Sequence, residues 1–585
     1  MRRTWIVFFV LLLAAGPAPS DKPQANGEEA KLTAFFKKYL DASFRLRPLE
    51  ATRLGDHRFD HLLDDLSAKA RAGWTDLVRQ TLRDLPKNVA YHKLPRHAQI
   101  DYEIFKHDLT RSLWLAENTH PFEEDPRVYN EYLSDSVYLL LAQSTQPKQV
   151  RIKNCIARMA YLPRIVAAAR QNLRHPPYVF VKTAIQQNRG AIAFYEQGIF
   201  DLAGETPQLS DLRPAARRAA ALLKEYQKFL EADLLQRADG DWRIGKEKFA
   251  RKLELELDAG LTAAEVLREA EAEFKRVESE MYVIARQLWS RLFPKKVLPP
   301  SDAPGRRTTI SRVLAHLNQD HGKVADLVEE VRGTVAKVKA FIKEKDILGL
   351  PDPDRCKIIE MPEFQRGFSV AYLNQAPALD PKADSFYAVS PPPRDWDTRR
   401  VASFMEEYNR SMIQILTIHE AYPGHYVQLA YSNRHPSLIR RVLFSGVFAE
   451  GWAVYTEQIM LDQGYGKGDL ALRLNQLKWY LRTVANAILD HKMHCGGMTD
   501  AEALAFLTRR AYQSEGEAVG KIIRAKLSSC QLSTYFVGRT AFYRLRQKVQ
   551  RRQGAKFELG RYHEAVLSHG TLPVKYLPEL LGERK

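Results

Sequence analysis

Two histidines and a glutamate stand close together in one segment of this sequence. Residues 417–428 read TIHEAYPGHYVQ, so His419 is followed directly by Glu420 and then by a second histidine, His425. A helical histidine–glutamate pair with a further histidine one turn later is a common way to seat a hydrolytic zinc ion. The imidazoles bind the metal and the glutamate acts as general base. The segment therefore predicts a metal-dependent hydrolase.

The spacing of the two histidines departs from the usual helical pattern. His425 follows His419 by six positions instead of four, so on a regular helix the side chains lie about 240° apart. Pro423 and Gly424 interrupt the helix, because proline cannot donate to the preceding turn and glycine accepts unusual backbone angles. We expect a kink or a π-type bulge that returns His425 to His419. The alternative is that the helix ends and His425 is a capping or surface residue.

A third metal ligand is predicted in the segment VFAEGWAVYTE at 447–457. Glu450 stands among apolar and aromatic residues, where an ionised carboxylate needs a cation nearby. That cation is either the metal ion or an arginine such as Arg440 or Arg441. Glu457, seven residues further and nearly on the same helix face, is expected to orient a ligand histidine, or else to be a solvated position.

Several strings of the sequence together resemble one known family. They are TIHEAYPGHYVQ, FAEGWAVYTE, LDHKMHCGGMT and CQLSTYFVG, with RPLEATRLGDHRFDHLLDDLS at 47–67 and MPEFQRGFSVAYLNQAPALD at 361–380. These strings resemble the bacterial domain-of-unknown-function 885 family (DUF885), which is grouped with gluzincin-type zinc peptidases. The resemblance implies one Zn²⁺ per chain, held by His419, His425 and Glu450, with Glu420 as the general base.

The same resemblance places further residues at the substrate cleft. Tyr535, in the string STYFVG, is the first candidate to stabilise the oxyanion of hydrolysis, and a core position is the alternative. His494 is the second candidate, with Asp490 one turn earlier to hold its ring; otherwise it is a cap or a buried hydrogen-bond partner. Arg539 is expected to receive a substrate carboxylate, which would favour exopeptidase action.

The whole chain predicts a mainly α fold, and the resemblance implies a large helical gluzincin-like peptidase with a small β-sheet beside the zinc helix. Long helical periodicity in segments such as 215–230 and 262–292 makes residues 31–350 a helical scaffold half. Residues 351–585 form the catalytic half. No linker or repeat divides the body at 21–585, and a chain of 585 residues can bury a large core.

A change of texture at about 357–389 predicts the small sheet. Three short β-like runs, at 356–360, 368–372 and 385–389, are separated by turn residues. The resemblance puts Ala371 and Tyr372 on an edge strand that binds the substrate backbone, and the alternative is an ordinary hairpin. Helices are expected to resume at about Thr398.

The N-terminal residues 1–20 have the features of a secretory signal peptide. Two arginines precede an apolar run at 5–15, and Ala18 and Ser20 suit a cleavage site. The run is too short for a comfortable membrane span, although an uncleaved anchor is the alternative. We therefore expect a secreted or periplasmic protein with no stable membrane span after cleavage.

The formal net charge of +18 is spread along the sequence. No basic stripe with interleaved aromatic residues is present, so the charge indicates a solvated basic surface and not a nucleic-acid-binding protein.

Four cysteines, Cys155, Cys356, Cys495 and Cys530, stand in a chain that is expected to be exported. Cys495 and Cys530 lie in the two strings that the resemblance places at the cleft, so a Cys495–Cys530 disulfide is the first pairing to expect. Free buried thiols are the alternative.

Taken together, the sequence predicts a zinc metallopeptidase that hydrolyses a peptide substrate with metal-activated water and Glu420 as base. One alternative is a metal-dependent amidase acting on a non-protein amide, such as a cell-wall fragment. Another is a non-catalytic helical binding protein with a structural zinc. An open coordination position near Glu420 would distinguish catalysis from a structural site. The oligomeric state is not specified.

Overall fold

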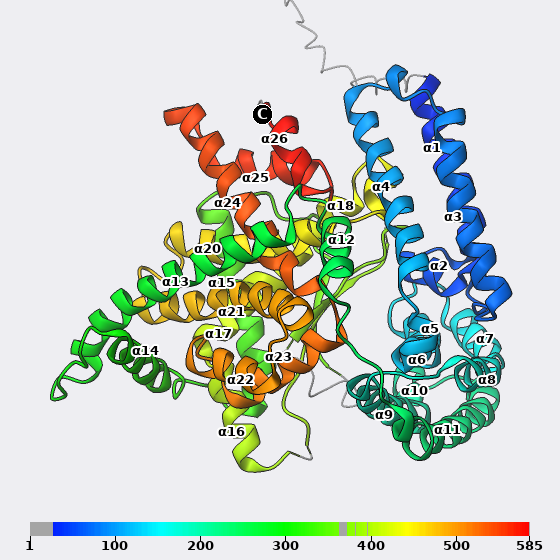
Figure 1. Cartoon of the computed structure of the whole chain (residues 1–585), viewed down its shortest axis with the longest axis horizontal. Coiled ribbons are helices and arrows are strands. Elements are labelled where there is room, and N and C mark those ends of the chain that lie inside the picture. The colour runs from blue at the N-terminus through cyan, green and yellow to red at the C-terminus, as the bar shows by residue number, and fades with distance from the viewer. Residues whose placement is uncertain (1–26, 362–370, 381, 395, 584–585) are drawn as a thin grey trace, which may run out of the picture.

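The computed structural model describes residues 27–361, 371–380, 382–394 and 396–583 (Figure 1). Helices dominate this part of the chain, and one small sheet accompanies them, so the predicted mainly α fold is confirmed. The predicted signal peptide at 1–20 and the start of the run at 368–372 lie outside the described residues. No helix among the described residues is long and apolar enough to span a membrane.

The N-terminal helices stand together at one side of the molecule, and α3 packs against both α1 and α4 (Figure 1). Their bounds are α1 Gly27–Leu46, α2 Pro48–Leu54, α3 Ala68–Asn88 and α4 Arg96–Asn118.

A second group of helices follows, and α6, α9 and α11 pack around its centre. The group comprises α5 Pro121–Glu124, α6 Pro126–Ala142, α7 Lys148–Met159, α8 Leu162–Asn172, α9 Tyr178–Ala193, α10 Ile199–Ala203 and α11 Leu209–Ala232. Its buried apolar side chains form a cluster separate from the main core.

The remaining helices make up the larger body. The first are α12 Lys246–Leu257, α13 Ala263–Leu292, α14 Ala303–Leu317 and α15 Leu327–Glu344. After the sheet come α16 Thr398–Glu407, α17 Arg410–Glu420, α18 His425–Asn433, α19 Leu438–Val442, α20 Gly446–Asp462, α21 Leu470–Cys495, α22 Asp500–Arg509, α23 Glu515–Leu527, α24 Thr534–Gln553, α25 Leu559–Ser568 and α26 Leu577–Leu580. The prediction that helices resume at about Thr398 is confirmed.

The sheet has three strands in the order β1-β3-β2. Strand β1 (Cys356–Glu360) pairs in parallel with β3 (Ser385–Val389), and β2 (Ala371–Asn374) pairs with β3 in antiparallel fashion. Strand β2 is therefore an edge strand, and it contacts α17. Both features agree with the position expected for Ala371 and Tyr372.

The segment at 47–67 is hydrogen-bonded to the loop that follows β2. The imidazole of His57 bonds through Nδ1 to Asp60 Oδ2 at 2.8 Å and through Nε2 to Asp380 Oδ2 at 3.2 Å. The Leu379 N–H donates to the Leu54 carbonyl at 2.8 Å. The hydrogen bond to Asp60, with a further contribution from Asp380, raises the pKa of His57 above its usual value. A protonated His57 thus joins the N-terminal helices to the sheet.

The joint at His57 gives a prediction about stability. Because its pKa is raised in the folded state, its stabilisation is complete below the unfolded-state pKa near 6.5 and is lost as the pH rises through the folded-state pKa. We expect His57→Gln to lower the free energy of unfolding by about 1–3 kcal/mol at pH 5.5, and by progressively less at higher pH. Denaturant unfolding between pH 5 and 9 measures both effects.

The exposed His175, which also contacts an aspartate, supplies the matched control. His175→Gln is expected to leave stability unchanged across the same pH range, because solvent screens exposed pairs. A His57→Gln defect that grew with pH would contradict the proposed protonated joint.

Candidate metal centre

The two predicted ligand histidines are separated by a helix break. Helix α17 ends at Glu420 and α18 begins at His425, and the Gly424 N–H donates to the Ile418 carbonyl at 3.0 Å. A Cβ atom at position 424 would lie 1.9 Å from the His419 carbonyl oxygen, so this close approach of the backbone admits only glycine. The expected kink or π-bulge was wrong in form, because the helix ends. The expected return of His425 to His419 is nevertheless present.

Helix α20 holds this break in place through Trp452. The buried indole N–H of Trp452 donates to the Pro423 carbonyl at 2.9 Å. Trp452 lies two residues after Glu450, so the same helix supplies both the third predicted ligand and the anchor of the break. Sequence reasoning missed this residue. The signal was a tryptophan in an apolar helix, whose N–H needs an acceptor when it is buried.

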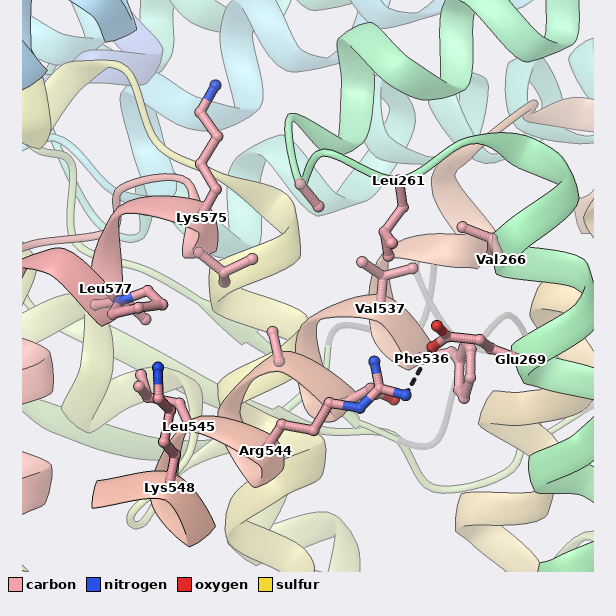
Figure 2. Close-up of a pocket in the computed structure, with 15 residues that line it drawn as sticks. Leu261, Val266, Glu269, Phe536, Val537, Arg544, Leu545, Lys548, Lys575 and Leu577 are labelled. Carbon is pink, nitrogen blue, oxygen red and sulfur yellow. Dashed lines mark hydrogen bonds and ion pairs between the residues drawn. The ribbon is translucent and has the colours of Figure 1, made fainter. Parts of the chain in front are cut away.

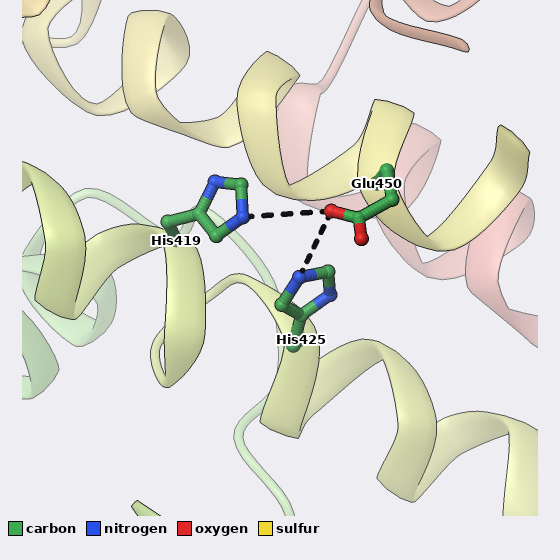
Figure 3. Close-up of side chains that lie close together, drawn as sticks. All are labelled: His419, His425 and Glu450. Atoms are coloured by element: carbon green, nitrogen blue, oxygen red, sulfur yellow. Dashed lines mark ion pairs between the residues drawn. The ribbon is translucent and has the colours of Figure 1, made fainter. Parts of the chain in front are cut away.

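His419, His425 and Glu450 converge on one point (Figure 3). Glu450 Oε2 lies 3.7 Å from His419 Nε2 and 3.4 Å from His425 Nε2, and the three ligand atoms all lie within 4.8 Å of one another. Ligand atoms around a tetrahedral zinc are separated by roughly 3.3–3.5 Å, given bond lengths of about 2.0–2.2 Å. The donor types and their spacing therefore fit a zinc ion.

The alternative partners for Glu450 are not used. Arg440 bonds through Nε to Asp101 Oδ1 at 2.5 Å and donates to the carbonyls of His97 and His569. Its guanidinium is thus fully engaged elsewhere. The ion pairs of Glu450 are those with the two histidines.

Glu457 orients His419, as the sequence suggested. Its Oε1 accepts a hydrogen bond from His419 Nδ1 at 2.7 Å, and its side chain is fully buried. This bond fixes the proton on Nδ1 and leaves Nε2 facing Glu450. Burial opposes a charged imidazole, but the hydrogen bonds to Glu450 and Glu457 outweigh it and raise the pKa of His419. The surroundings of His419 thus favour a cation, whether a proton or a metal ion.

Glu420 lies between the histidine cluster and the edge strand. Its Oε2 accepts a hydrogen bond from the backbone N–H of Leu373 in β2 at 3.0 Å. The carboxylate is therefore held in one orientation, next to His419 in the chain and beside the strand that carries Ala371 and Tyr372. A general base for a substrate lying along β2 would occupy this position.

A large cavity reaches the cluster at Glu450. Its volume is about 850 Å³, and its walls come both from the N-terminal helices and from the segments before α20 and α24. Representative lining residues are Tyr39, Arg47, Trp74, Lys252, Glu450 and Gln531.

A smaller cavity of about 290 Å³ lies beside α24, where Arg544 and Glu269 form an ion pair at 2.9 Å (Figure 2). None of the three predicted metal ligands lines this smaller cavity. The larger cavity is the one associated with the candidate site.

Tyr535 approaches the cluster because α20 and α24 touch through their backbones. A Cβ atom on Gly538 would lie 2.0 Å from the Val447 carbonyl oxygen, and one on Gly451 would lie 2.4 Å from Gly538. Gly451 adjoins Glu450, and Gly538 lies one turn after Tyr535. Burial and the negative charge of Glu450 raise the pKa of Tyr535 to about 12.

The hydroxyl of Tyr535 keeps its own proton available. Its oxygen accepts a hydrogen bond from Arg524 Nη2 at 2.9 Å. Tyr535 therefore remains the candidate for donating to a substrate oxygen.

The structure contradicts the roles predicted for His494 and Asp490. His494 is 2% exposed, and its Nε2 bonds to the carbonyls of Ala525 at 2.9 Å and Ser528 at 3.3 Å, so it caps the end of α23. Asp490 does not touch the His494 ring. It accepts hydrogen bonds from the Cys530 N–H at 3.0 Å and the Ser533 hydroxyl at 2.9 Å. Both residues hold the chain before α24.

Arg539 also differs from its predicted role. Its guanidinium is buried, lies 3.5 Å from Glu273 Oε1, and stacks on Tyr480 and Tyr543 with centroid distances of 4.2 and 4.6 Å. It also donates to Gln458. Arg539 therefore has protein partners of its own and does not line the cavity at Glu450, where a substrate carboxylate was expected.

The predicted Cys495–Cys530 disulfide is absent, and all four cysteines are free thiols. The buried Cys530 Sγ lies 3.7 Å from the Phe249 carbonyl, to which it donates. That thiol therefore faces α12 and not Cys495. The alternative of free thiols is correct, although only Cys155 and Cys530 are buried.

Together, the helical fold and the His-His-Glu cluster define a class of helical proteins with one candidate zinc site. The chain belongs to the bacterial family of proteins of unknown function called DUF885, whose family model matches residues 48–581.

Two solved structures share the fold. The first, a "putative lipoprotein of unknown function" from Shewanella oneidensis, is 30% identical, with a TM-score of 0.79 over 94% of this chain and 100% of that one. The second, a "putative lipoprotein" from Colwellia psychrerythraea, is 17% identical, with a TM-score of 0.78 over 95% of this chain and 98% of that one. No curated protein matches the chain.

The hydrogen bond between Glu457 and His419 gives a prediction about metal affinity. Glu457→Gln keeps the shape of the side chain but removes the negative charge behind the imidazole. We expect the affinity for Zn²⁺ to fall about 10- to 100-fold, as measured by competition with a chromophoric chelator. The exposed Glu558 supplies the matched control, since Glu558→Gln changes the same charge far from the cluster. Unaltered zinc affinity in Glu457→Gln would exclude an orienting role.

Proposed function

We propose that this protein is an exported, zinc-dependent peptidase. The observation that carries the proposal is the convergence of His419, His425 and Glu450 on one point, with Glu420 held beside an edge strand. Two imidazoles and one carboxylate are the donor set of catalytic zinc sites that keep a fourth position open for substrate or water.

The zinc ion would supply one part of the chemistry. When bound, it acts as a Lewis acid toward an amide carbonyl and lowers the pKa of water. Glu457 supports this role by keeping His419 Nε2 directed at the site, and the break before α18 supports it by directing His425 there.

The chain's own residues would carry the proton and hold the substrate. Glu420 accepts a proton from water and delivers it to the leaving amine, and its bond to the Leu373 N–H keeps the carboxylate in position. Tyr535 donates its hydroxyl proton to the oxygen on which negative charge develops. Strand β2 stands at the edge of the sheet, which is the position where an extended peptide backbone would add as a further strand.

The large cavity favours catalysis over a structural zinc. A closed structural site has four protein ligands and needs no access from solvent. Here the described residues provide three ligands, and a cavity of about 850 Å³ opens onto one of them.

Export is part of the proposal because of the N-terminal sequence. Residues 1–20 have the charge and apolar pattern of a signal peptide, and both similar structures are described as lipoproteins, a class that bacteria export.

Replacing Glu420 separates the binding of metal from its use. Glu420→Gln keeps the side-chain shape but cannot accept a proton, so we expect peptide cleavage to fall by roughly 10²- to 10⁴-fold while zinc content is retained. Cleavage of a mixed peptide library, read by mass spectrometry, and elemental analysis of the same preparation measure the two quantities. Full peptide cleavage by Glu420→Gln would contradict the proposed role of Glu420 as general base.

The ligand variants provide the opposite pattern. His419→Ala, His425→Ala and Glu450→Gln each remove a donor, so all three are expected to lose both zinc and activity. A His425→Ala protein with stoichiometric zinc and full activity would contradict the proposed ligand set. Absence of cleavage by the zinc-loaded parent across the whole peptide library would contradict the peptidase itself.

A further inference from the structure

Helix α23 carries a buried cation that has no partner. Lys521 is 4% exposed, and among the described residues it forms no ion pair or hydrogen bond. Lysine is almost never buried this deeply unless it is paired, because removing an ammonium group from water is costly. This lysine therefore needs an explanation.

The carboxylate that Lys521 would normally use is already engaged. Glu517 lies four residues earlier on α23, where a lysine commonly finds a partner. However, Glu517 Oε2 pairs with Arg482 of α21 at 2.9 Å, and its Oε1 accepts a hydrogen bond from the Tyr408 hydroxyl at 3.0 Å. One carboxylate thus faces two cations, and Lys521 is the cation left over.

A second cation without a carboxylate lies one turn further along. Arg524 donates to Gln531 Oε1 at 3.0 Å and to the Tyr535 hydroxyl at 2.9 Å, both of which are neutral acceptors. None of the described carboxylates lies in ion-pair contact with Arg524, so the pair Lys521 and Arg524 carries positive charge that α23 and its neighbours do not balance.

This cationic pair is linked to the cavity at Glu450 through Gln531. Gln531, which Arg524 contacts, lines the same cavity as Glu450. Glu450 is also close enough to influence Lys521 electrostatically. Burial, followed by Arg482 and Arg524, lowers the pKa of Lys521 well below its usual value, and Glu517 and Glu450 oppose this only in part. The surroundings of Lys521 thus hold more positive than negative charge.

Glu450 itself does not supply the missing charge. Its carboxylate forms ion pairs with His419 and His425 and none with Lys521. Three carboxylates, those of Glu420, Glu450 and Glu457, also surround the cluster, and they would repel a highly charged anion. A single carboxylate is the group that matches one buried ammonium and one guanidinium.

We propose that Lys521 and Arg524 bind a carboxylate of the substrate next to the metal centre. This inference rests on the proposed peptidase function and names its substrate class, peptides that carry a carboxylate near the scissile bond. That carboxylate is either the C-terminal one or an acidic side chain, since both present the same chemistry. The site takes the role that the sequence had assigned to Arg539.

Peptide binding to the full-length protein tests this assignment without relying on turnover. We would use the zinc-loaded Glu420→Gln protein and calorimetry with three short peptides: one with a free C-terminus, its C-terminal amide, and an amide with a glutamate side chain. We expect at least one carboxylate peptide to bind about 10- to 100-fold more tightly than the neutral amide. Which carboxylate is preferred identifies its source.

Variants assign the preference to the two cations. Lys521→Met and Arg524→Gln are each made in the Glu420→Gln protein. We expect each to reduce the preference for the carboxylate peptide over the neutral amide from tenfold or more to less than about threefold. Arg509→Gln, which removes an exposed cation from α22 and not from α23, is expected to retain the preference. Arg524 is exposed, so that variant stays informative even if Lys521→Met folds poorly.

Stability supplies an independent readout for Lys521. A buried lysine that binds a ligand destabilises the ligand-free protein, because its ammonium group has no partner there. Lys521→Met should therefore unfold at the same temperature as the parent or at a higher one. A clear fall in unfolding temperature would show that Lys521 is a structural residue and would overturn its assignment.

Equal binding of all three peptides would overturn the carboxylate site, whether or not the parent cleaves peptides. A preference that survives in both variants would overturn the choice of residues. The peptidase proposal fails on a different measurement. If the zinc-loaded parent cleaves no peptide, that proposal is wrong, whereas the carboxylate site is judged by the binding preference.

Discussion

The arrangement of the candidate metal centre depends on the contact between Gly424 and the last turn of α17. Six residues separate the two histidines, and a continuous helix would direct them to different sides. Instead, α17 ends at Glu420 and α18 begins at His425. The backbone at Gly424 must therefore pass close to the His419 carbonyl oxygen. The bond from Trp452 to Pro423 then ties the turn to α20. Hence the three predicted ligands, which come from three helices, are held in one fixed arrangement.

The electrostatics of the site follow from that frame. Glu450 and Glu457 approach His419 from opposite ring nitrogens, and Glu457 lies fully out of water. Burial raises the pKa of Glu457, and the hydrogen bond from the His419 imidazole opposes that shift. Such a group of carboxylates is favourable only around a cation. The fold thus places the buried Glu457 and the half-buried Glu450 around one imidazole, which is the physical basis for regarding the cluster as a candidate metal centre.

Much of this cluster could be predicted from the sequence because its chemistry constrains residue types at short spacing. Glu450 and Glu457 share one helix face, and the sequence indicated the Pro423–Gly424 break, although not that the helix would end there. The strands could be located from their β-branched and aromatic runs. These features are local, so an inspection of neighbouring residues was sufficient.

The errors concern side chains whose partners come from distant segments. His494 lies near the right part of the chain, but it bonds to the end of α23, and Arg539 is enclosed by α13 and α21. Lys521 was missed for the same reason. Because Glu517 lies four residues earlier, the sequence predicts an exposed ion pair between Glu517 and Lys521 on one helix. In the structure Glu517 pairs with Arg482 of another helix, so Lys521 has no ion-pair partner among the described residues. Which partner such a side chain meets depends on how its helix is rotated about its axis. The residues next to it in the sequence do not determine that rotation.

The cavity at Glu450 has walls of two different origins. The predicted metal ligands come from α17, α18 and α20, whereas residues such as Tyr39, Arg47 and Trp74 belong to the N-terminal part of the chain. The two parts are joined at separate points, by His57 to Asp380 and by Arg440 to Asp101. Substitutions in α1, α3 and α4 can therefore reshape what the cavity accepts without disturbing the residues that would hold the metal. In evolutionary terms, such a division would let ligand preference change through the N-terminal helices while the candidate metal centre stays the same.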